Sequence, residues 1–205
     1  MVYTQTLDAG NLNAKFDVLV LVDGAFRKGA GGGAQPAAAS IPAEYRGWLG
    51  RITEDKTVPQ LKQFVEAGGS LVTIGGSTGL AELLGVAVSD PLKGLSREKF
   101  YVPGSLLRAS VDTANPLAFG MSTDAMVFFD NSPAFQTGGG VHKVAWFASK
   151  DSLASGWAWG QEHLEGATAV AEATVGSGKV VLLGPEVAFR GQSHGTFKLL
   201  FNALY

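Results

Sequence analysis

The sequence has no cysteine, little charge and no long apolar run. The absence of cysteine excludes disulfide bonds, thiolate nucleophiles and cysteine-ligated metals. Lys and Arg number 16 against 18 Asp and Glu, for a net charge of −2, so the chain lacks the basic excess typical of nucleic-acid binders. No apolar run reaches the roughly 18 residues that a membrane-spanning helix needs. We therefore expect neither a nucleic acid nor a membrane as a partner.

Apolar residues are abundant, by contrast. They make up 46% of the 205 residues, while charged residues make up 17%, and this balance favours a sizeable buried core. The sequence shows no internal repeat and no second domain boundary, so we expect residues 1–205 to form a single domain. It begins shortly before the first predicted strand and finishes in a predicted helix, which is the pattern of a domain excised from a larger protein.

Apolar runs and glycine turns predict a βαβ unit in the first half of the chain. Residues 16–22 and 70–74 are nearly continuous apolar runs, typical of strands buried on both faces of a parallel sheet. Between them, residues 58–67 carry apolar side chains at helical spacing. This order indicates a right-handed crossover. Shorter elements are also expected: helices over 43–49 and 80–84, and a loop over the Gly- and Ala-rich residues 29–40.

The second half of the chain has a less regular pattern. Residues 167–173 and 179–183 are expected to form a β-hairpin, because a glycine-containing turn separates two apolar runs. The other predicted elements are strands over 106–111, 126–129 and 143–147, and a helix over 195–204.

A glycine-rich turn follows the predicted strand at 70–74. Gly75-Gly76-Ser77-Thr78-Gly79 has the G-x-S-x-G spacing between a strand and a helix, where a nucleophile elbow belongs. A nucleophilic serine needs a base. His194 is the candidate, because it starts the last helix, near the edge where the carboxyl ends of the strands meet. The alternative is that Ser77 only caps the helix or, with Gly76, faces a ligand.

Two tryptophans lie in a second glycine-rich segment. Trp157 and Trp159 belong to Ser155-Gly156-Trp157-Ala158-Trp159-Gly160, which is not expected to form a regular element. Such aromatic residues can form a carbohydrate- or peptide-binding surface, or can pack in a core or an interface. We therefore keep Trp157 and Trp159 as candidate ligand-binding residues.

Two segments resemble the class I glutamine amidotransferases. The turn at 75–79 resembles their G-x-C-x-G nucleophile turn, and Gly184-Pro185-Glu186 resembles their H-P-E motif. The resemblance implies an α/β flavodoxin-like fold, a three-layer sandwich with a mostly parallel central sheet and an antiparallel hairpin near the C-terminal end. It aligns Ser77 with the nucleophilic cysteine, Gly184 with the histidine and Glu186 with the glutamate that orients it. Because glycine cannot accept a proton, we expect a vestigial site that does not act on glutamine.

Other stretches resemble a narrower family. Residues 41–46, 145–147, 155–160 and 183–190 resemble the amidotransferase-like domain found C-terminal to the catalytic domain in some bacterial zinc carboxypeptidase-type peptidases. The resemblance implies a periplasmic or secreted hydrolase as the parent protein, with zinc only on its separate peptidase domain and no cofactor or metal in this chain. It also implies that the peptidase domain is the partner; a homodimer is the other candidate.

These observations together predict a non-catalytic accessory domain, a pseudoenzyme that packs against the peptidase domain or modulates it. A vestigial pocket is expected around Ser77, Glu186 and Arg190. A carboxylate at a strand end needs a partner, so Glu186 is expected to pair with Arg190 or with backbone N–H groups, and Glu186→Gln is expected to lower stability. The alternatives are a serine hydrolase that uses Ser77 with His194, and a carbohydrate- or peptide-binding module that uses Trp157 and Trp159.

Overall fold

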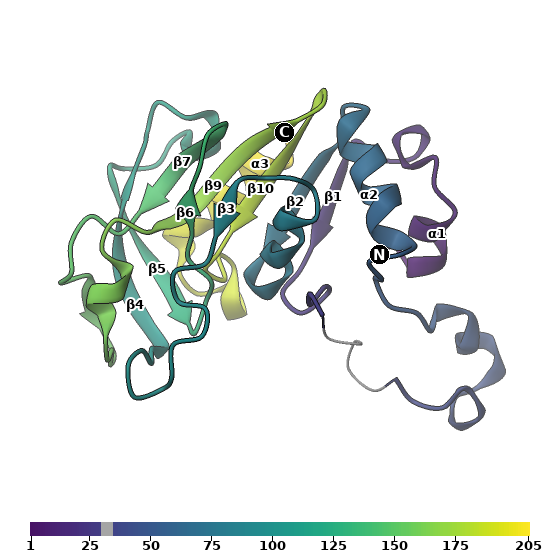
Figure 1. Ribbon diagram of the computed structural model, residues 1–205, viewed down its shortest axis with the longest axis horizontal. Helices are drawn as coiled ribbons and strands as arrows, with labels where there is room; N and C mark the ends of the chain where they lie inside the picture. Colours follow the sequence, from purple (N-terminus) through teal and green to yellow (C-terminus); the bar gives the residue numbers. More distant parts are fainter. Residues whose placement is uncertain (30–34) are drawn as a thin grey trace.

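A computed structural model describes residues 1–29 and 35–205, and it is built around one mixed β-sheet (Figure 1). The strands are β1 (Val18–Leu21), β2 (Ser70–Ile74), β3 (Val88–Ser89), β4 (Pro103–Val111), β5 (Asp124–Asp130), β6 (Gln136–Thr137), β7 (Val141–Trp146), β8 (Leu153–Ser155), β9 (Thr168–Val175) and β10 (Gly178–Leu183). Their order in the sheet is β1-β2-β10-β9-β7-β4-β5, with β8 paired to β4, and β3 and β6 form a separate two-stranded ladder.

In the described part of the chain, three short α-helices accompany the sheet. They are α1 (Thr4–Asp8), α2 (Thr57–Glu66) and α3 (Phe197–Ala203). Within the described ranges, no helix is long and apolar enough to cross a membrane. Short 3-10 segments lie at Leu12–Ala14, Ala38–Ser40, Ala43–Trp48, Gly75–Glu82, Pro116–Ala118, Gln161–Leu164, Phe189–Gly191 and His194–Thr196.

The sheet is parallel at one end only. β2 pairs in parallel with β1 and with β10, whereas the pairs β10–β9, β9–β7, β7–β4 and β4–β5 are antiparallel. The α/β class and the β9–β10 hairpin are confirmed, but the prediction of a mostly parallel sheet is wrong. The physical reason is visible in β5, whose residues alternate between buried and exposed, as in an antiparallel strand with one solvated face.

Two apolar cores lie on opposite faces of the sheet. α1 and α2 cover one face of β1, β2 and β10, where Leu61 and Phe64 of α2 meet Leu71 and Leu182. On the other face, α3 inserts Leu199 into a core shared with β4, β5 and β7. The alternation along β10, with Val180 and Leu182 in the first core and Val181 and Leu183 in the second, shows that this strand is buried on both faces.

The predicted elements differ from the structure mainly in their helices. α2 and β2 lie where the sequence predicts them, but residues 43–49 and 80–84 do not form α-helices. The segment Ala43–Trp48 has no buried residue, so no packing stabilises a longer helix. The segment Gly75–Glu82 contains three glycines, which disfavour the α-helix. Residues 30–34 of the predicted loop at 29–40 lie outside the described residues.

Candidate functional site

The carboxyl ends of β1, β2 and β10 meet at a cavity of about 650 Å³, which we call the crevice. Each of the three strands contributes the residues that follow it: Asp23 after β1, Gly75 and Gly76 after β2, and Glu186 after β10. Asp130, at the end of β5, lines the opposite wall. A ligand site is expected at this edge of an open α/β sheet. Of the predicted site residues, Gly76 and Glu186 line the crevice, whereas Ser77, Gly184 and Arg190 do not.

Ser77 is turned away from the crevice. Its side chain is fully buried, and it is not among the residues that line the cavity. The hydroxyl donates to the carbonyl oxygen of Val22 at 2.7 Å and accepts from the backbone N–H of Phe26 at 3.1 Å. Both hydrogen-bonding directions of the hydroxyl are therefore used to fix the chain after β1 against the glycine turn.

The carboxylate of Asp23 is bonded to the glycine turn that precedes Ser77. Asp23 Oδ1 accepts from the N–H of Gly76 at 2.6 Å. Gly75 adopts a left-handed φ of 57°, and a Cβ atom there would lie 2.4 Å from Asp23 Oδ1. The N–H of Gly76 and the space beside Gly75 are therefore taken up by Asp23 and are not open to a ligand. Asp23 was not among the predicted site residues, although its place directly after the first predicted strand was a usable signal.

The position that the resemblance aligns with the catalytic histidine has no space for a side chain. A Cβ atom on Gly184 would lie 2.4 Å from the carbonyl oxygen of Pro133 and 2.9 Å from that of Ala169. Ala169 belongs to β9, next to β10, and its carbonyl accepts the Gly184 N–H at 2.9 Å. Because both obstacles are backbone atoms, glycine at 184 is a requirement of strand packing and not only the loss of a base.

Glu186 and Arg190 do not form the predicted pair. Within the described residues, the carboxylate of Glu186 has no hydrogen-bond or ion-pair partner, and burial, followed by the charges of Asp23 and Asp130, raises its pKa. Arg190 adopts a φ of 50° and places its guanidinium 5.1 Å from the ring centroid of Phe189. The predicted partnership is wrong because the chain turns at Arg190 and directs that side chain onto an aromatic ring.

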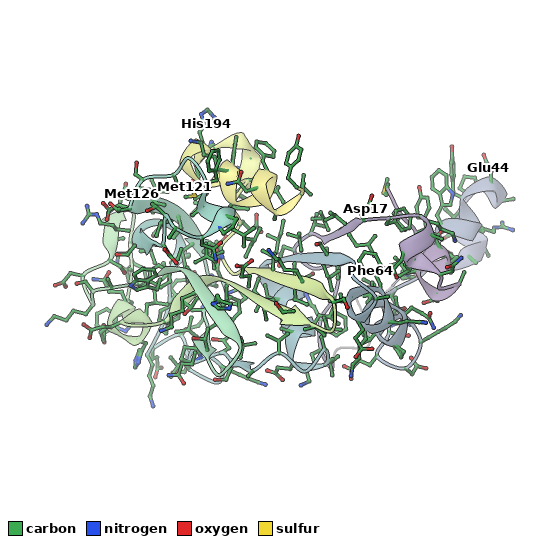
Figure 2. All side chains as sticks on the ribbon, turned by 90° about the horizontal axis from the view of Figure 1, so that it is seen from above. Asp17, Glu44, Phe64, Met121, Met126 and His194 are labelled. Atoms are coloured by element: carbon green, nitrogen blue, oxygen red, sulfur yellow. The ribbon has the colours of Figure 1, made fainter. Side chains whose placement is uncertain are left out.

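His194 likewise has partners other than Ser77. It lies on the 3-10 turn before α3, at the outer margin of the molecule (Figure 2). Its Nε2 atom lies 3.0 Å from the carbonyl oxygen of Gly191. Its ring packs against that of Phe197, with the two ring centroids 5.1 Å apart. The Ser77–His194 dyad is therefore not assembled: each side chain is held by other groups.

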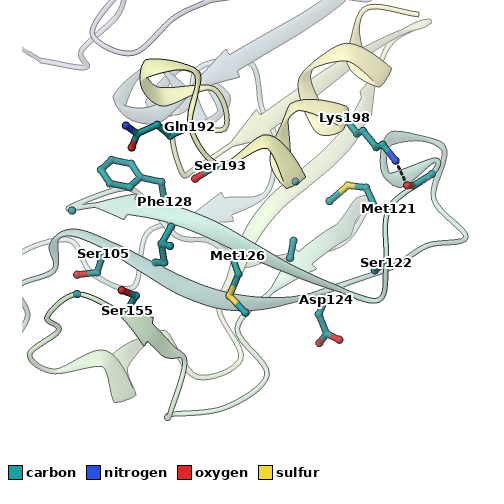
Figure 3. Close-up of a pocket in the computed structure, with 16 residues that line it drawn as sticks. Ser105, Met121, Ser122, Asp124, Met126, Phe128, Ser155, Gln192, Ser193 and Lys198 are labelled. Atoms are coloured by element: carbon teal, nitrogen blue, oxygen red, sulfur yellow. Dashed lines mark hydrogen bonds between the residues drawn. The ribbon is translucent and has the colours of Figure 1, made fainter.

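A second cavity, of about 600 Å³, lies beside β4 and β5 (Figure 3). Met126 and Phe128 of β5 face it, together with Gln192 and Ser193 from the turn before α3. Lys198 of α3 also lines it and donates to the carbonyl oxygen of Gly120. The cavity shares no lining residue with the crevice. The cavity was not predicted, because the strand pattern of residues 126–129 does not show which of their side chains face it.

The chain matches no protein-family model and no curated protein, but it is similar to several solved structures. A putative GMP synthase component from Thermoplasma acidophilum has a TM-score of 0.55 and 12% identity, over 99% of this chain and 77% of that one. A cytoplasmic protein from Salmonella typhimurium has a TM-score of 0.52 and 13% identity, over 98% of this chain and 77% of that one.

A β-galactosidase from Bacillus circulans sp. alkalophilus has a TM-score of 0.53 and 12% identity, over 93% of this chain. The present chain spans 22% of the length of that protein. At such identities the likeness concerns the fold alone. The GMP synthase component has a class I glutamine amidotransferase-type fold. The chain therefore has an amidotransferase-like α/β fold, as the glycine turn and the Gly184-Pro185-Glu186 segment indicate.

Proposed function

We propose that this chain is a non-catalytic, amidotransferase-like accessory domain of a zinc carboxypeptidase-type metallopeptidase. It packs against the peptidase domain or shapes the access of substrate to it. The observation that carries the non-catalytic part is that no nucleophile and base are brought together at the crevice. Ser77 is bonded inward, Asp23 fills the turn, and the backbone around Gly184 leaves no space for a base.

The accessory role is supported by an apolar surface that residues 1–29 and 35–205 leave exposed. β1 is an edge strand, and we call the exposed side chains of Val20 in β1 and of Val22 just after it, with the partly buried Val18, the β1 edge. Val20 is 38% exposed and Val22 61% exposed, and both line a groove of about 900 Å³ together with Ile52. A contiguous exposed apolar surface on an edge strand is typical of an interaction site.

The resemblance supplies the identity of the partner. The segments at 155–160 and 183–190 resemble the domain that accompanies zinc carboxypeptidase-type peptidases. The serine hydrolase interpretation would require the Ser77 hydroxyl to leave two internal partners and to find a base, so we do not propose it.

The test starts from the zinc-peptidase domain encoded in the same reading frame or transcript. The two purified proteins are mixed and their association is measured by sedimentation. Val22→Lys is expected to weaken association at least about tenfold, a cost of roughly 1.4 kcal/mol, because it puts a charge on the β1 edge. The matched control is Phe119→Lys, since Phe119 is 78% exposed and lies on another element, after the turn at 116–118.

Three results would contradict the proposal. One is a reading frame and transcript without any zinc-peptidase domain. Another is two proteins that remain separate at concentrations of about 100 µM, where complexes of even weak affinity assemble. The third is equal loss of association in the Val22→Lys and Phe119→Lys variants, which would show that the β1 edge is not the surface involved.

A further inference from the structure

Two exposed indoles lie on one face of a small aromatic cluster, which we call the aromatic platform and define as Tyr101, Trp157 and Trp159. Trp157 is 52% exposed and Trp159 is 55% exposed. None of the three lines the crevice, and the proposed accessory function does not use them. Large aromatic side chains exposed to this extent carry most of the binding energy in many recognition sites.

Backbone pairing brings the three rings together. Tyr101 and Trp159 form an isolated antiparallel bridge, in which each N–H donates to the carbonyl oxygen of the other residue, at 2.9 and 3.0 Å. Directly opposed residues project their side chains to the same face of such a pair. Trp157, two residues earlier, lies beside Tyr101, with the two ring centroids 5.7 Å apart.

The platform is held rigidly before any ligand binds. Ser105 Oγ accepts from the N–H of Trp157 at 2.9 Å and donates to its carbonyl oxygen at 2.5 Å. The indole Nε1 of Trp159 donates to the carbonyl oxygen of Glu98 at 2.6 Å. Gly160 adopts a φ of 72°, and a Cβ atom there would lie 1.9 Å from the carbonyl oxygen of Lys99. Because the rings are already ordered, binding loses little side-chain entropy.

Hydrogen-bonding groups of mixed charge surround the rings. The exposed guanidinium of Arg97 lies 4.2 Å from the ring centroid of Tyr101, and its N–H groups remain available as donors. The phenol oxygen of Tyr101 has no hydrogen-bond partner among residues 1–29 and 35–205. Glu98 and Lys99, also exposed, add one charge of each sign. This rim of polar groups around the rings therefore favours neither a polyanion nor a polycation as the ligand.

The platform is too small for a stable protein interface. An aromatic side chain buries 150–250 Å², so two half-exposed indoles offer roughly 200 Å², whereas a stable interface buries about 800 Å² on each partner. In segments 97–105 and 153–163, which the structure describes completely, Trp157 and Trp159 are the only large apolar side chains that are exposed. The geometry suits a ligand with small apolar faces and a hydroxylated edge.

We propose that the aromatic platform binds a neutral oligosaccharide. The C–H faces of successive pyranose rings stack on Trp157 and Trp159, and their hydroxyl groups hydrogen-bond to Arg97 and to the phenol of Tyr101. Stacking on indoles gives affinity without a charge, and the donors and acceptors of the rim fix the orientation of the sugar.

The test is a titration of the full chain with cellohexaose, chitohexaose and maltohexaose, followed by tryptophan fluorescence and by calorimetry. At least one hexasaccharide is expected to bind saturably. Trp157→Ala and Trp159→Ala should each weaken that binding about fivefold or more, as expected for the loss of one aromatic contact. Trp48→Ala is the matched control, because Trp48 is 51% exposed but stacks on Tyr3; its affinity should equal that of the unmodified chain.

Thermal melting establishes whether each variant is folded. If Trp157→Ala does not fold, Trp157→Phe replaces it, and the affinity of that variant is expected to lie between those of the unmodified chain and of a chain without the ring. The proposal is overturned if none of the three hexasaccharides binds saturably. It is also overturned if the double variant Trp157→Ala/Trp159→Ala binds as well as the unmodified chain. Binding of single-stranded oligothymidylate in place of every sugar would point instead to base stacking and would overturn it as well.

Discussion

The two ends of the sheet differ in how they use their polar groups. At the parallel end, Asp23 after β1 accepts from the N–H of Gly76 after β2, and the Ser77 hydroxyl bonds to the backbone of Val22 and Phe26. At the antiparallel end, β4 and the segment after β8 hold Trp157 and Trp159 in place but leave about half of each ring exposed. The parallel end therefore has a motif turn whose polar groups are already bonded, whereas the antiparallel end has exposed aromatic side chains.

The parallel end shows that a strand-to-helix turn with the spacing of a nucleophile motif can have a purely structural role. The glycine turn after β2 keeps the G-x-S-x-G spacing of a nucleophile elbow, but the left-handed residue is Gly75 and not Ser77. Its hydroxyl and its N–H group, however, stabilise the neighbouring loop after β1. A motif at this position therefore indicates the fold more reliably than it indicates a reaction. The three predictions below test the internal bonding of the parallel end.

The largest effect is expected from restoring the histidine of the H-P-E motif. Gly184→His should destabilise the chain by about 3 kcal/mol or more, because the new Cβ atom would meet the carbonyl oxygens of Pro133 and Ala169. Gly139→Ala is the control, since nothing lies within 4 Å of a Cβ atom there. Urea denaturation measures both. A stable Gly184→His variant would show that the histidine position is open.

A smaller loss is expected for the buried serine. Ser77→Ala should lower the free energy of unfolding by about 2 kcal/mol, because the N–H of Phe26 loses its partner in a buried site. Ser177→Ala, in the exposed β9–β10 turn, should change it by less than about 0.5 kcal/mol. If thermal melting shows the same loss of stability in both variants, the Ser77 hydroxyl does not stabilise the loop after β1.

The smallest effect has the opposite sign. Burial and two neighbouring carboxylates raise the pKa of Glu186 above its ordinary value of 4.5, so the folded state resists ionisation of this group. Its favourable contribution is complete below pH 4.5 and is lost as the pH rises through the folded pKa. Glu186→Gln should therefore raise the free energy of unfolding at neutral pH by about 0.5 kcal/mol, with no gain in acid.

Thermal melting from pH 3 to pH 8 checks this prediction, with Glu44→Gln as the control because Glu44 is exposed. The sequence alone suggests the reverse, a stabilising pair of Glu186 with Arg190, and the two accounts differ in the sign of the effect at neutral pH. A loss of stability in Glu186→Gln at pH 7 would mean that the carboxylate has a favourable partner after all.

The sequence predicted the parallel end well. β2 was recognisable from its continuous apolar run, since a strand buried on both faces has no polar alternation. α2 was recognisable from its apolar spacing and the two glycines that follow it. The glycine turn and Glu186 could be placed at one edge, because the carboxyl ends of parallel strands meet there. These features depend on short-range pattern and on one topological rule.

The antiparallel end and the partners of the site residues could not be obtained in the same way. β8 has three residues, too few to show a period, and its pairing with β4 joins segments far apart in the chain. The bond of Asp23 to Gly76 depends on how close β1 and β2 lie. The direction of Arg190 depends on a left-handed backbone at a non-glycine residue, which sequence pattern rarely reveals.

The central claim, that the reaction centre is closed, is tested most directly by a fluorophosphonate label on the full chain. The Ser77 hydroxyl is buried, and it both donates and accepts a hydrogen bond within the chain. Intact protein mass spectrometry should therefore show no stoichiometric adduct, and incubation with glutamine should release no glutamate. A single adduct on the unmodified chain that disappears in Ser77→Ala would contradict the account.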